Sequence, residues 1–309
     1  MSTTMTWVGV FCAITTPLTD DDRVDTKLLG EHATWLVEHG VRGIVTCGSL
    51  GEGATLGMDE RTHVFETCVQ AVGDRVPVVA AVSARATADA VALARHVWQA
   101  GGSGLMVLPP YVHRGPWFEM RDHVRAIIDA TPLSCMLYSN LPAYGVDFTV
   151  PRISELAELC PNLHAVKDSG GDVRRLTELR CMLGDRVAAL AGLDDMALEA
   201  GLAGVQGWIA GLVNAFPAES VALFDLAREG RREPALELYR WFLPLLQLDT
   251  VPEFVQLIKL VQSRVGWGNE RVRLPRQSVR GELRRRTLAL VERALAERPD
   301  LSVLMEDAR

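Results

Sequence analysis

Eight short apolar runs, each followed by an amphipathic stretch, constrain the fold of this chain more than any other feature. Continuous apolar character is typical of strands that are covered on both faces, as in a parallel sheet. The runs are VGVFCAIT (8–15), GIVTCG (43–48), VPVVAAVS (76–83), GLMVLPP (104–110), LSCMLYS (133–139), LHAVKD (163–168), VAALAG (187–192) and GWIAGLV (207–213).

The stretches between these runs have the pattern of helices. In residues 25–40, DTKLLGEHATWLVEHG, Leu29 and Leu36 share one helical face and Gly40 is placed to end the helix. Similar glycine stops follow at Gly73, Gly101 and Gly184. Eight alternations of strand and helix predict an α/β protein, a (β/α)8 TIM barrel with a C-terminal helical domain; a doubly wound open sheet is the alternative.

The C-terminal part of the chain has a different pattern. Residues 226–249, 252–266 and 280–298 carry helical repeats of apolar residues without an intervening strand pattern. We therefore expect a catalytic barrel over residues 1–225 and a C-terminal helical domain over residues 226–309. The final stretch, 300–309, is expected to be a loosely held tail.

Composition excludes several classes of function. The 309 residues carry a formal charge of −7, from 32 basic and 39 acidic side chains, without a dense basic stripe. Nucleic acid is therefore not an expected partner. No apolar run approaches the roughly 18 residues that span a membrane, and the N-terminus lacks a secretory pattern, so no membrane partner is expected and the chain is predicted to be cytoplasmic.

The cysteine and histidine spacing gives no support to a metal site. The six cysteines never form a C-x-x-C pair, and the seven histidines form neither an H-x-H nor an H-x-x-x-H pair. The prediction is a protein without a metal or another cofactor, in which most cysteines are small core residues.

If the barrel prediction is right, the chemistry lies at the C-terminal ends of the strands. The second run leads into the glycine-rich loop at residues 48–52, the fifth ends near Tyr138 and the sixth near Lys167. Uncovered backbone N–H groups in such a loop suit an anionic carboxylate. A lysine behind apolar residues can be a nucleophile, because an apolar setting favours its neutral form.

Each of these features also has a purely structural explanation. The loop is not a P-loop and could be ordinary turn chemistry. Tyr138 could be a core aromatic residue, and Lys167 could end a strand and reach solvent. Together, however, an anion cradle, a phenol and an amine at one barrel mouth would provide a carboxylate site, a proton shuttle and an imine-forming nucleophile. Lys27 and Lys259, the other two lysines, are expected to be solvated or interface residues, and Glu52 is expected to tie down its loop.

The whole chain resembles the dihydrodipicolinate synthase and N-acetylneuraminate lyase superfamily of Schiff-base lyases. The resemblance implies a (β/α)8 barrel with a C-terminal helical domain, usually a homotetramer, which acts on pyruvate or other 2-oxo acids without a metal. The matching stretches are GVFCAITTPL (9–18), GSLGEGATL (48–56), LPPY (108–111), MLYSN (136–140), AYG (143–145), AVKDSGGD (165–172) and AGLDD (191–195).

The resemblance assigns roles by position. Lys167 matches the lysine that forms the imine, Tyr138 the tyrosine that shuttles protons, and Ser49 the loop hydroxyl that binds carboxylate and relays protons to the tyrosine. The remaining positions belong to the carboxylate cradle or line the pocket around the imine; they are Gly48, Leu50, Gly192 and Ile209. Leu50 replaces a residue that is commonly a second hydroxyl.

Two departures disfavour dihydrodipicolinate synthase itself. Its arginine that holds the carboxylate of the aldehyde substrate corresponds here to Ala143, so the bidentate clamp is lost. Its second tyrosine, contributed across a subunit interface, corresponds to Val112. The adjacent His113 could partly substitute or could be a surface residue. These changed positions also leave the oligomer, a homotetramer or a dimer, open.

A narrower similarity points to the subgroup of Δ1-pyrroline-4-hydroxy-2-carboxylate deaminase. It is carried by GSLGE (48–52), MVLPP (106–110), AYGVD (143–147), GGDVRR (170–175), GWIAGLVNAFP (207–217), YRWFLPLLQLD (239–249) and VRLPR (272–276). Such an enzyme takes a small cyclic imine carboxylate as its substrate. The alternatives are a pyruvate-dependent aldolase that makes or cleaves a C–C bond, a sugar-acid dehydratase and, from another class, a non-catalytic binding barrel.

Overall fold

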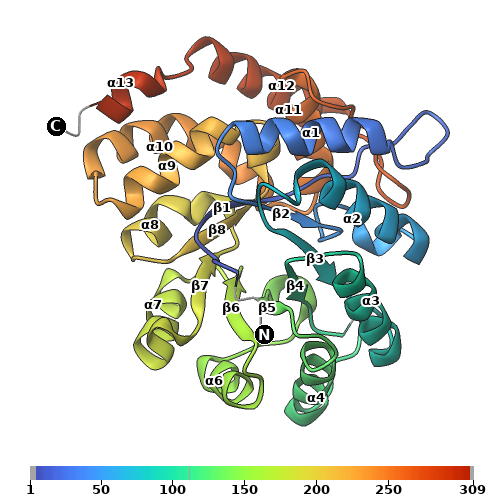
Figure 1. Ribbon diagram of the computed structural model, residues 1–309. Coiled ribbons are helices and arrows are strands. Elements are labelled where there is room, and N and C mark those ends of the chain that lie inside the picture. Colours follow the sequence, from blue (N-terminus) through green and yellow to red (C-terminus); the bar gives the residue numbers. More distant parts are fainter. Residues whose placement is uncertain (1–4, 111, 307–309) are drawn as a thin grey trace.

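The computed structural model describes residues 5–110 and 112–306, so Tyr111 of the LPPY stretch lies outside the described residues. Eight parallel strands form a closed barrel, in which β1 pairs with both β2 and β8 (Figure 1). They are β1 (Gly9–Ala13), β2 (Gly43–Thr46), β3 (Val78–Val82), β4 (Gly104–Val107), β5 (Ser134–Ser139), β6 (Leu163–Asp168), β7 (Ala188–Ala191) and β8 (Gly207–Ala210). The barrel prediction is confirmed, since closure through β1 and β8 excludes an open sheet.

Helices surround the barrel. They are α1 (Thr26–Glu38), α2 (Met58–Val72), α3 (Thr87–Gln99), α4 (Trp117–Ile128), α5 (Leu141–Tyr144), α6 (Val150–Leu159), α7 (Val173–Leu183) and α8 (Ala197–Leu202). Helix α1 shows how local residues set the two ends of a helix. At its start the Asp25 carboxylate accepts a hydrogen bond from the Leu28 N–H at 3.0 Å, and just beyond its end Gly40 has a φ of +93°. Leu29 and Leu36 of this helix are buried, as its apolar face predicts.

The C-terminal region is more helical than expected. It contains α9 (Pro217–Arg228), α10 (Arg232–Leu246), α11 (Phe254–Arg264), α12 (Gly281–Ala296) and α13 (Leu301–Glu306). The expected boundary at 225/226 falls inside α9, which packs against β1, α8 and α10. The prediction of a loose tail is wrong for residues 301–306, because Leu304 of α13 is buried and Arg231 donates to its carbonyl oxygen.

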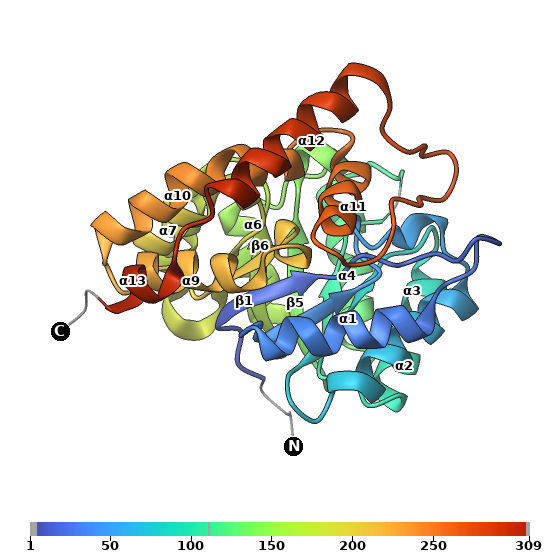
Figure 2. The same cartoon turned by 90° about the horizontal axis from the view of Figure 1, so that it is seen from above.

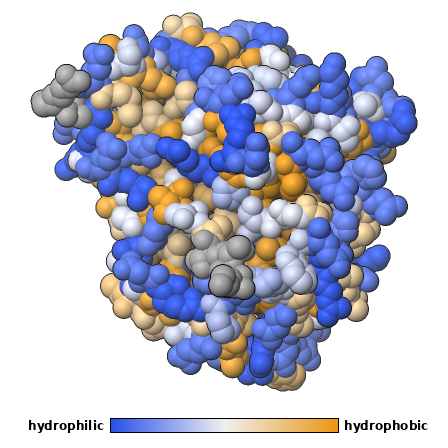
Figure 3. Space-filling view, in the orientation of Figure 1, coloured by the Kyte–Doolittle hydropathy of each residue, from blue (hydrophilic) through white to orange (hydrophobic). Residues whose placement is uncertain are grey.

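The N-terminal segment and helices α11 and α12 lie at different ends of the barrel. In Figure 2 the described N-terminal segment begins at one end of the barrel, whereas α11 and α12 lie toward the other end. Hydrophilic side chains form much of the outer edge of the face shown in Figure 3. Among the described helices, none has both the length and the apolar character needed to cross a membrane.

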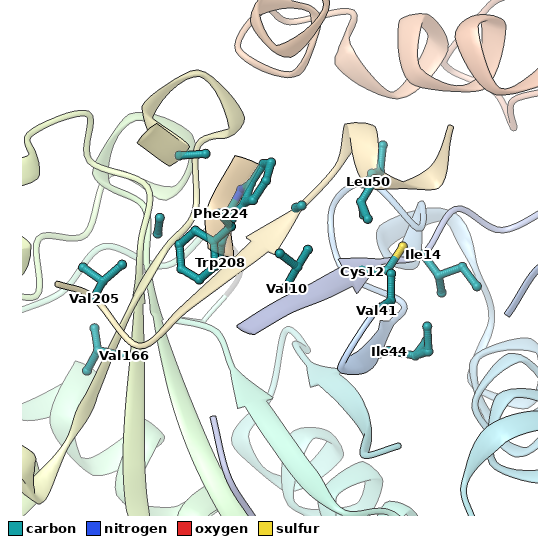
Figure 4. Packing of buried hydrophobic residues seen from close by; sticks show 14 of the residues in the cluster. Val10, Cys12, Ile14, Val41, Ile44, Leu50, Val166, Val205, Trp208 and Phe224 are labelled. Atoms are coloured by element: carbon teal, nitrogen blue, oxygen red, sulfur yellow. The ribbon is translucent and has the colours of Figure 1, made fainter. Parts of the chain in front are cut away.

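Two apolar cores hold the structure together. One fills the barrel interior and includes Phe11, Met136 and Ala165. The other joins the strands to the outer helices; in Figure 4, Trp208 of β8 lies beside Phe224 of α9, with ring centroids 6.2 Å apart. Successive strand residues alternate between these two cores, and this alternation decides which side chains face the barrel interior.

Candidate active site

A cavity of about 140 Å³ opens at the C-terminal ends of the barrel strands. Its lining comes from strand ends, the loops that follow them and the segment between α10 and α11. The lining residues are Ala13, Gly48, Ser49, Leu50, Met106, Tyr138, Asn140, Ala143, Lys167, Ser169, Gly192, Leu193, Ile209, Gly211, Asp249 and Phe254. Eight of the ten positions singled out from the sequence are therefore at this cavity; Val112 and His113 are not.

Lys167 is held in the barrel interior by the alternation of β6. Ala165 belongs to the interior core and Val166 to the outer core, so the next residue, Lys167, points inward. Only 6% of Lys167 is exposed, which excludes the structural explanation that this lysine reaches solvent. An amine in such a setting can attack a carbonyl or imine carbon.

Tyr138 lies directly beside Lys167. The two residues are paired in register between β5 and β6, and Lys167 Nζ lies 4.3 Å from the centroid of the tyrosine ring. The Tyr138 hydroxyl accepts a hydrogen bond from Asn140 Nδ2 at 2.9 Å, which leaves its own proton available to the cavity. A phenol and an amine are thus arranged for proton transfer at one reacting centre.

The hydroxyl partner of Ser49 is Tyr144, a residue that sequence reasoning did not assign. Ser49 Oγ and the Tyr144 hydroxyl are 2.6 Å apart, whereas the expected relay ran from Ser49 to Tyr138. The ring of Tyr144 meets the ring of Tyr138 edge to face, with centroids 5.7 Å apart. The available signal was modest: Tyr144 is one of four tyrosines and follows Tyr138 by one short helix.

A buried ion pair fixes the loop that carries Ser49. Lys259 Nζ of α11 donates to Glu52 Oε1 at 2.6 Å and to the Arg271 carbonyl oxygen at 2.6 Å, and Arg273 N–H donates to Glu52 Oε2 at 3.0 Å. Glu52 ties down its loop as predicted. The prediction for Lys259 is wrong, because this side chain is 2% exposed. Burial lowers the pKa of Lys259, and the Glu52 carboxylate opposes that shift.

Gly192 leaves room for two side chains of the cavity wall. A Cβ atom at this position would lie 2.1 Å from Ser169 Oγ and 2.7 Å from Lys167 Cε. Ser169, which sequence reasoning did not single out, is 2% exposed, and its Oγ has no hydrogen-bond partner among the described residues. The close approach of β6 and β7 residues at this point therefore depends on glycine.

Two acidic residues lie on the β8 side of the cavity, and neither was assigned from the sequence. The Asp194 carboxylate accepts hydrogen bonds from the N–H groups of Gly211 and Leu212 and from Trp208 Nε1. Burial raises the pKa of Asp194 to about 6, against these hydrogen bonds and the Lys167 charge. Asp249 lines the cavity itself, and burial together with the Asp194 charge raises the pKa of Asp249 well above its usual range.

The segment after β4 leads the two remaining predicted residues away from the cavity. Val112 is 91% exposed and has a φ of +67°. His113 is exposed, and its Nε2 lies 2.6 Å from Glu119 Oε2. In the described part of the single chain both residues are therefore surface groups.

The comparison with known proteins agrees with this architecture. The sequence profile of the dihydrodipicolinate synthetase family matches residues 6–294. The chain belongs to the dihydrodipicolinate synthetase family. As a member of this family of class I lyases it is an enzyme, and the alternative of a non-catalytic binding barrel is set aside.

Relatives of this dihydrodipicolinate synthetase family member span nearly the whole chain. The 4-hydroxy-tetrahydrodipicolinate synthases of Bartonella bacilliformis and Agrobacterium fabrum are each 31% identical to it, over 86% and 87% of this chain and 91% and 92% of theirs. The chloride-inhibited dihydrodipicolinate synthase of Acinetobacter baumannii, solved in complex with pyruvate, superposes with a TM-score of 0.89 at 28% identity, over 94% of this chain and 99% of that one.

Proposed function

We propose that the enzyme is a Schiff-base lyase that acts like Δ1-pyrroline-4-hydroxy-2-carboxylate deaminase, with Lys167 as the imine-forming residue. The observation that carries the proposal is the set of ionisable groups in the cavity. Of its described lining residues only Lys167 carries an amine and only Asp249 a carboxyl group, and Ala143 stands where an arginine clamp would hold a second carboxylate. A substrate with one carboxylate suits this cavity better than one with two.

The reaction would begin at the carbon that bears the carboxylate. In its neutral form the Lys167 amine adds to the C=N carbon of the cyclic imine, and the ring C–N bond then breaks to leave an imine to the enzyme. The Tyr138 ring centroid lies 4.3 Å from Lys167 Nζ. Tyr138 carries protons between the lysine nitrogen and the ring nitrogen of the substrate. Loss of a C3 proton gives an enamine, and loss of the C4 hydroxyl follows. A proton shift from C5 to C3 then converts the C5 amine into an imine. Hydrolysis of this imine and of the lysine imine releases ammonia and 2-oxoglutarate semialdehyde.

The remaining cavity residues hold the substrate in this scheme. Gly48, Ser49 and Leu50 would bind its carboxylate, in part through backbone N–H groups. The Ser49–Tyr144 hydroxyl pair, 2.6 Å apart, connects this carboxylate site to the ring of Tyr138. Gly192 and Ile209 would shape the space around the imine.

Pyruvate-dependent C–C bond formation or cleavage is the second candidate. The relative from Acinetobacter baumannii was solved with pyruvate, and both reactions share the same lysine imine. A sugar-acid dehydratase would also use it. Products separate the three: purified enzyme is given 4-hydroxy-1-pyrroline-2-carboxylate, 4-hydroxy-2-oxoglutarate and a 2-oxo-3-deoxy sugar acid, and ammonia, pyruvate and consumed sugar acid are measured.

The proposed deaminase should release ammonia from the pyrroline at least tenfold faster than it turns over either other compound. Pyruvate release as the fastest reaction would replace the deaminase with an aldolase. A Lys27→Ala variant serves as the matched control for Lys167→Ala, because Lys27 is on the exposed surface of α1. Only the Lys167 variant should lose turnover.

We also propose that the enzyme is a homotetramer or a dimer in solution. Support comes from Val112, an apolar residue that is 91% exposed in the single chain, at a position that the resemblance to dihydrodipicolinate synthase places at a subunit contact. Light scattering after size-exclusion chromatography tests this proposal. A Val112→Asp variant should dissociate, and a monomeric wild-type protein would contradict the proposal.

A further inference from the structure

Asp249 is an acidic group of the Lys167 cavity that the scheme above leaves without a role. It ends the short helix η5 (Gln247–Asp249) between α10 and α11, so it reaches the cavity from the C-terminal helices rather than from a barrel strand. Tyr138 enters from β5. The cavity therefore has a phenol on one wall and a carboxyl group on another.

Local packing sets the position of the Asp249 carboxyl group. A Cβ atom at Gly211, just after β8, would lie 2.3 Å from Asp249 Oδ1 and 3.3 Å from Leu50 Cδ2. Only glycine at 211 lets the carboxyl group lie against the strand end. The Gly211 N–H in turn donates to Asp194 at 3.0 Å, so the backbone beneath Asp249 is itself held in place.

The two neighbouring acids, Asp194 and Asp249, differ in their hydrogen bonds and in their burial. Asp194 is fully buried and holds three donors, from Gly211, Leu212 and Trp208, which fix it as an acceptor. Asp249 is half-buried on the cavity wall, and its pKa is governed by burial and by the charges of Asp194, Lys167 and Asp195. Burial and Asp194 raise it, so Asp249 is the acid of the pair that keeps a proton.

We propose that Asp249, as a neutral carboxylic acid, donates the proton that lets the C4 hydroxyl group leave from the Lys167-bound intermediate. This assignment rests on the proposed function. In the step, the enamine nitrogen forms a C=N⁺ double bond to C2, the C2=C3 pair moves to C3=C4, and the C4–O bond breaks with its electron pair. The Asp249 proton goes to that oxygen, giving water, a carboxylate and an unsaturated iminium ion; the carboxylate then takes a proton from solvent.

The role proposed for Asp249 also favours elimination over C–C cleavage. Cleavage requires a base that removes a proton from the hydroxyl oxygen, whereas elimination requires an acid that adds one. A neutral Asp249 favours elimination, and the new carboxylate would stabilise the iminium charge that forms beside it.

The test uses the Asp249→Asn variant, which keeps the shape of the side chain and removes its acidic proton. Asp225→Asn is the matched control, since Asp225 is a half-buried acid of α9 that does not line the cavity. Each protein is given 4-hydroxy-1-pyrroline-2-carboxylate in D2O, and NMR follows both deuterium entry at C3 and ammonia release. A 4-fluoro analogue provides a leaving group that does not need a full proton.

The proposal predicts that Asp249→Asn exchanges C3 protons within about threefold of wild type while ammonia release falls about 100-fold, as is typical for loss of a general acid. With the fluoro analogue the deficit should shrink to less than about tenfold. Equal loss of exchange and release would show a positioning role instead, and wild-type release would remove Asp249 from the reaction.

A measurement on the wild-type enzyme covers the case in which the variant does not fold. Elimination of hydroxide should slow as rising pH ionises Asp249, whereas elimination of fluoride should not, with Asp194, Asp195 and Lys167 as the charged groups that face Asp249. Identical profiles for the two leaving groups would contradict the proposal. A wild-type enzyme that exchanges no C3 proton would overturn the proposed function itself, because exchange precedes the step assigned to Asp249.

Discussion

Tyr138 and Lys167 are paired in register on neighbouring strands, and the lysine Nζ lies 4.3 Å from the centre of the tyrosine ring. The amine thus lies over the face of the ring, within the range of a cation–π contact. The phenol is therefore positioned both to hold the lysine and to exchange protons with it.

Removal of the Tyr138 hydroxyl should slow turnover without loss of the fold. We expect Tyr138→Phe to reduce kcat by about 10²- to 10⁴-fold, because the ring that packs against Lys167 stays while the proton carrier is lost. Tyr239→Phe is the control, since the Tyr239 hydroxyl binds the Asp195 carbonyl oxygen outside the cavity. Steady-state kinetics and thermal unfolding measure the two effects; an active Tyr138→Phe enzyme would refute the relay.

Ser49 and Tyr144 should behave as one unit. Because their hydroxyl groups are 2.6 Å apart, Ser49→Ala and Tyr144→Phe remove the same hydrogen bond. We expect the double variant to lose little more kcat/KM than either single one, as found for coupled residues. A double-mutant cycle measures the coupling, and fully additive losses would mean that the pair does not act together.

A methyl group at position 192 should close the cavity around the lysine. In Gly192→Ala the new Cβ would lie 2.1 Å from Ser169 Oγ and 2.7 Å from Lys167 Cε, so both must shift. A misplaced reacting group of this kind costs about 100-fold in rate. Removal of the Ser169 hydroxyl in a Gly192→Ala, Ser169→Ala double variant should restore part of kcat, and no restoration would place the strain elsewhere.

Removal of one partner of the buried Glu52–Lys259 ion pair should destabilise the fold more than removal of both charges. Both side chains are 2% exposed, so Lys259→Met leaves a buried carboxylate without its cation and should lower the free energy of unfolding by about 3–5 kcal/mol. The Lys259→Met, Glu52→Gln double variant should be more stable than Lys259→Met alone. Urea unfolding of the three proteins measures this difference; equal stabilities would contradict a charge penalty.

His32 should make the protein sensitive to acid. Burial lowers the pKa of His32 from 6.5 to about 4, although a hydrogen bond to the Asn214 carbonyl oxygen opposes the shift. The unfolded chain therefore binds a proton at higher pH than the folded chain, and stability from this group is complete above pH 6.5 and falls as the pH drops toward 4. The loss should approach about 3 kcal/mol. The free energy of unfolding is measured between pH 7 and pH 4. In His32→Gln it should fall less over this range than in the wild-type protein, by the contribution of His32.

Much of the fold could be predicted from local pattern, and parts of the site could not. The eight apolar runs gave the strands because a buried parallel strand is apolar on both faces, and Lys167 stood out because it interrupts one of them. Lys259 has the same kind of apolar neighbours, but its partner Glu52 is 207 residues away, and only the tertiary structure brings the two together.

Asp249 and Tyr144 were missed for a related reason. Asp249 follows a helical apolar pattern at the end of α10, where an acid is most often solvated, and nothing local indicates that Gly211 leaves space for it beside Lys167. Tyr144 could not be predicted because its hydroxyl partner, Ser49, is 95 residues away in the sequence. Val112 and His113 lie outside the cavity, because the segment after β4 carries them to the surface.

The imine on Lys167 is tested most directly by borohydride reduction in the presence of 4-hydroxy-1-pyrroline-2-carboxylate or pyruvate, followed by intact mass and peptide mapping. We expect one stable adduct on the peptide that carries Lys167, absent in Lys167→Ala and unchanged in Lys27→Ala. A folded wild-type protein that binds these compounds but forms no adduct, or an adduct mapped to Lys27 or Lys259, would contradict it.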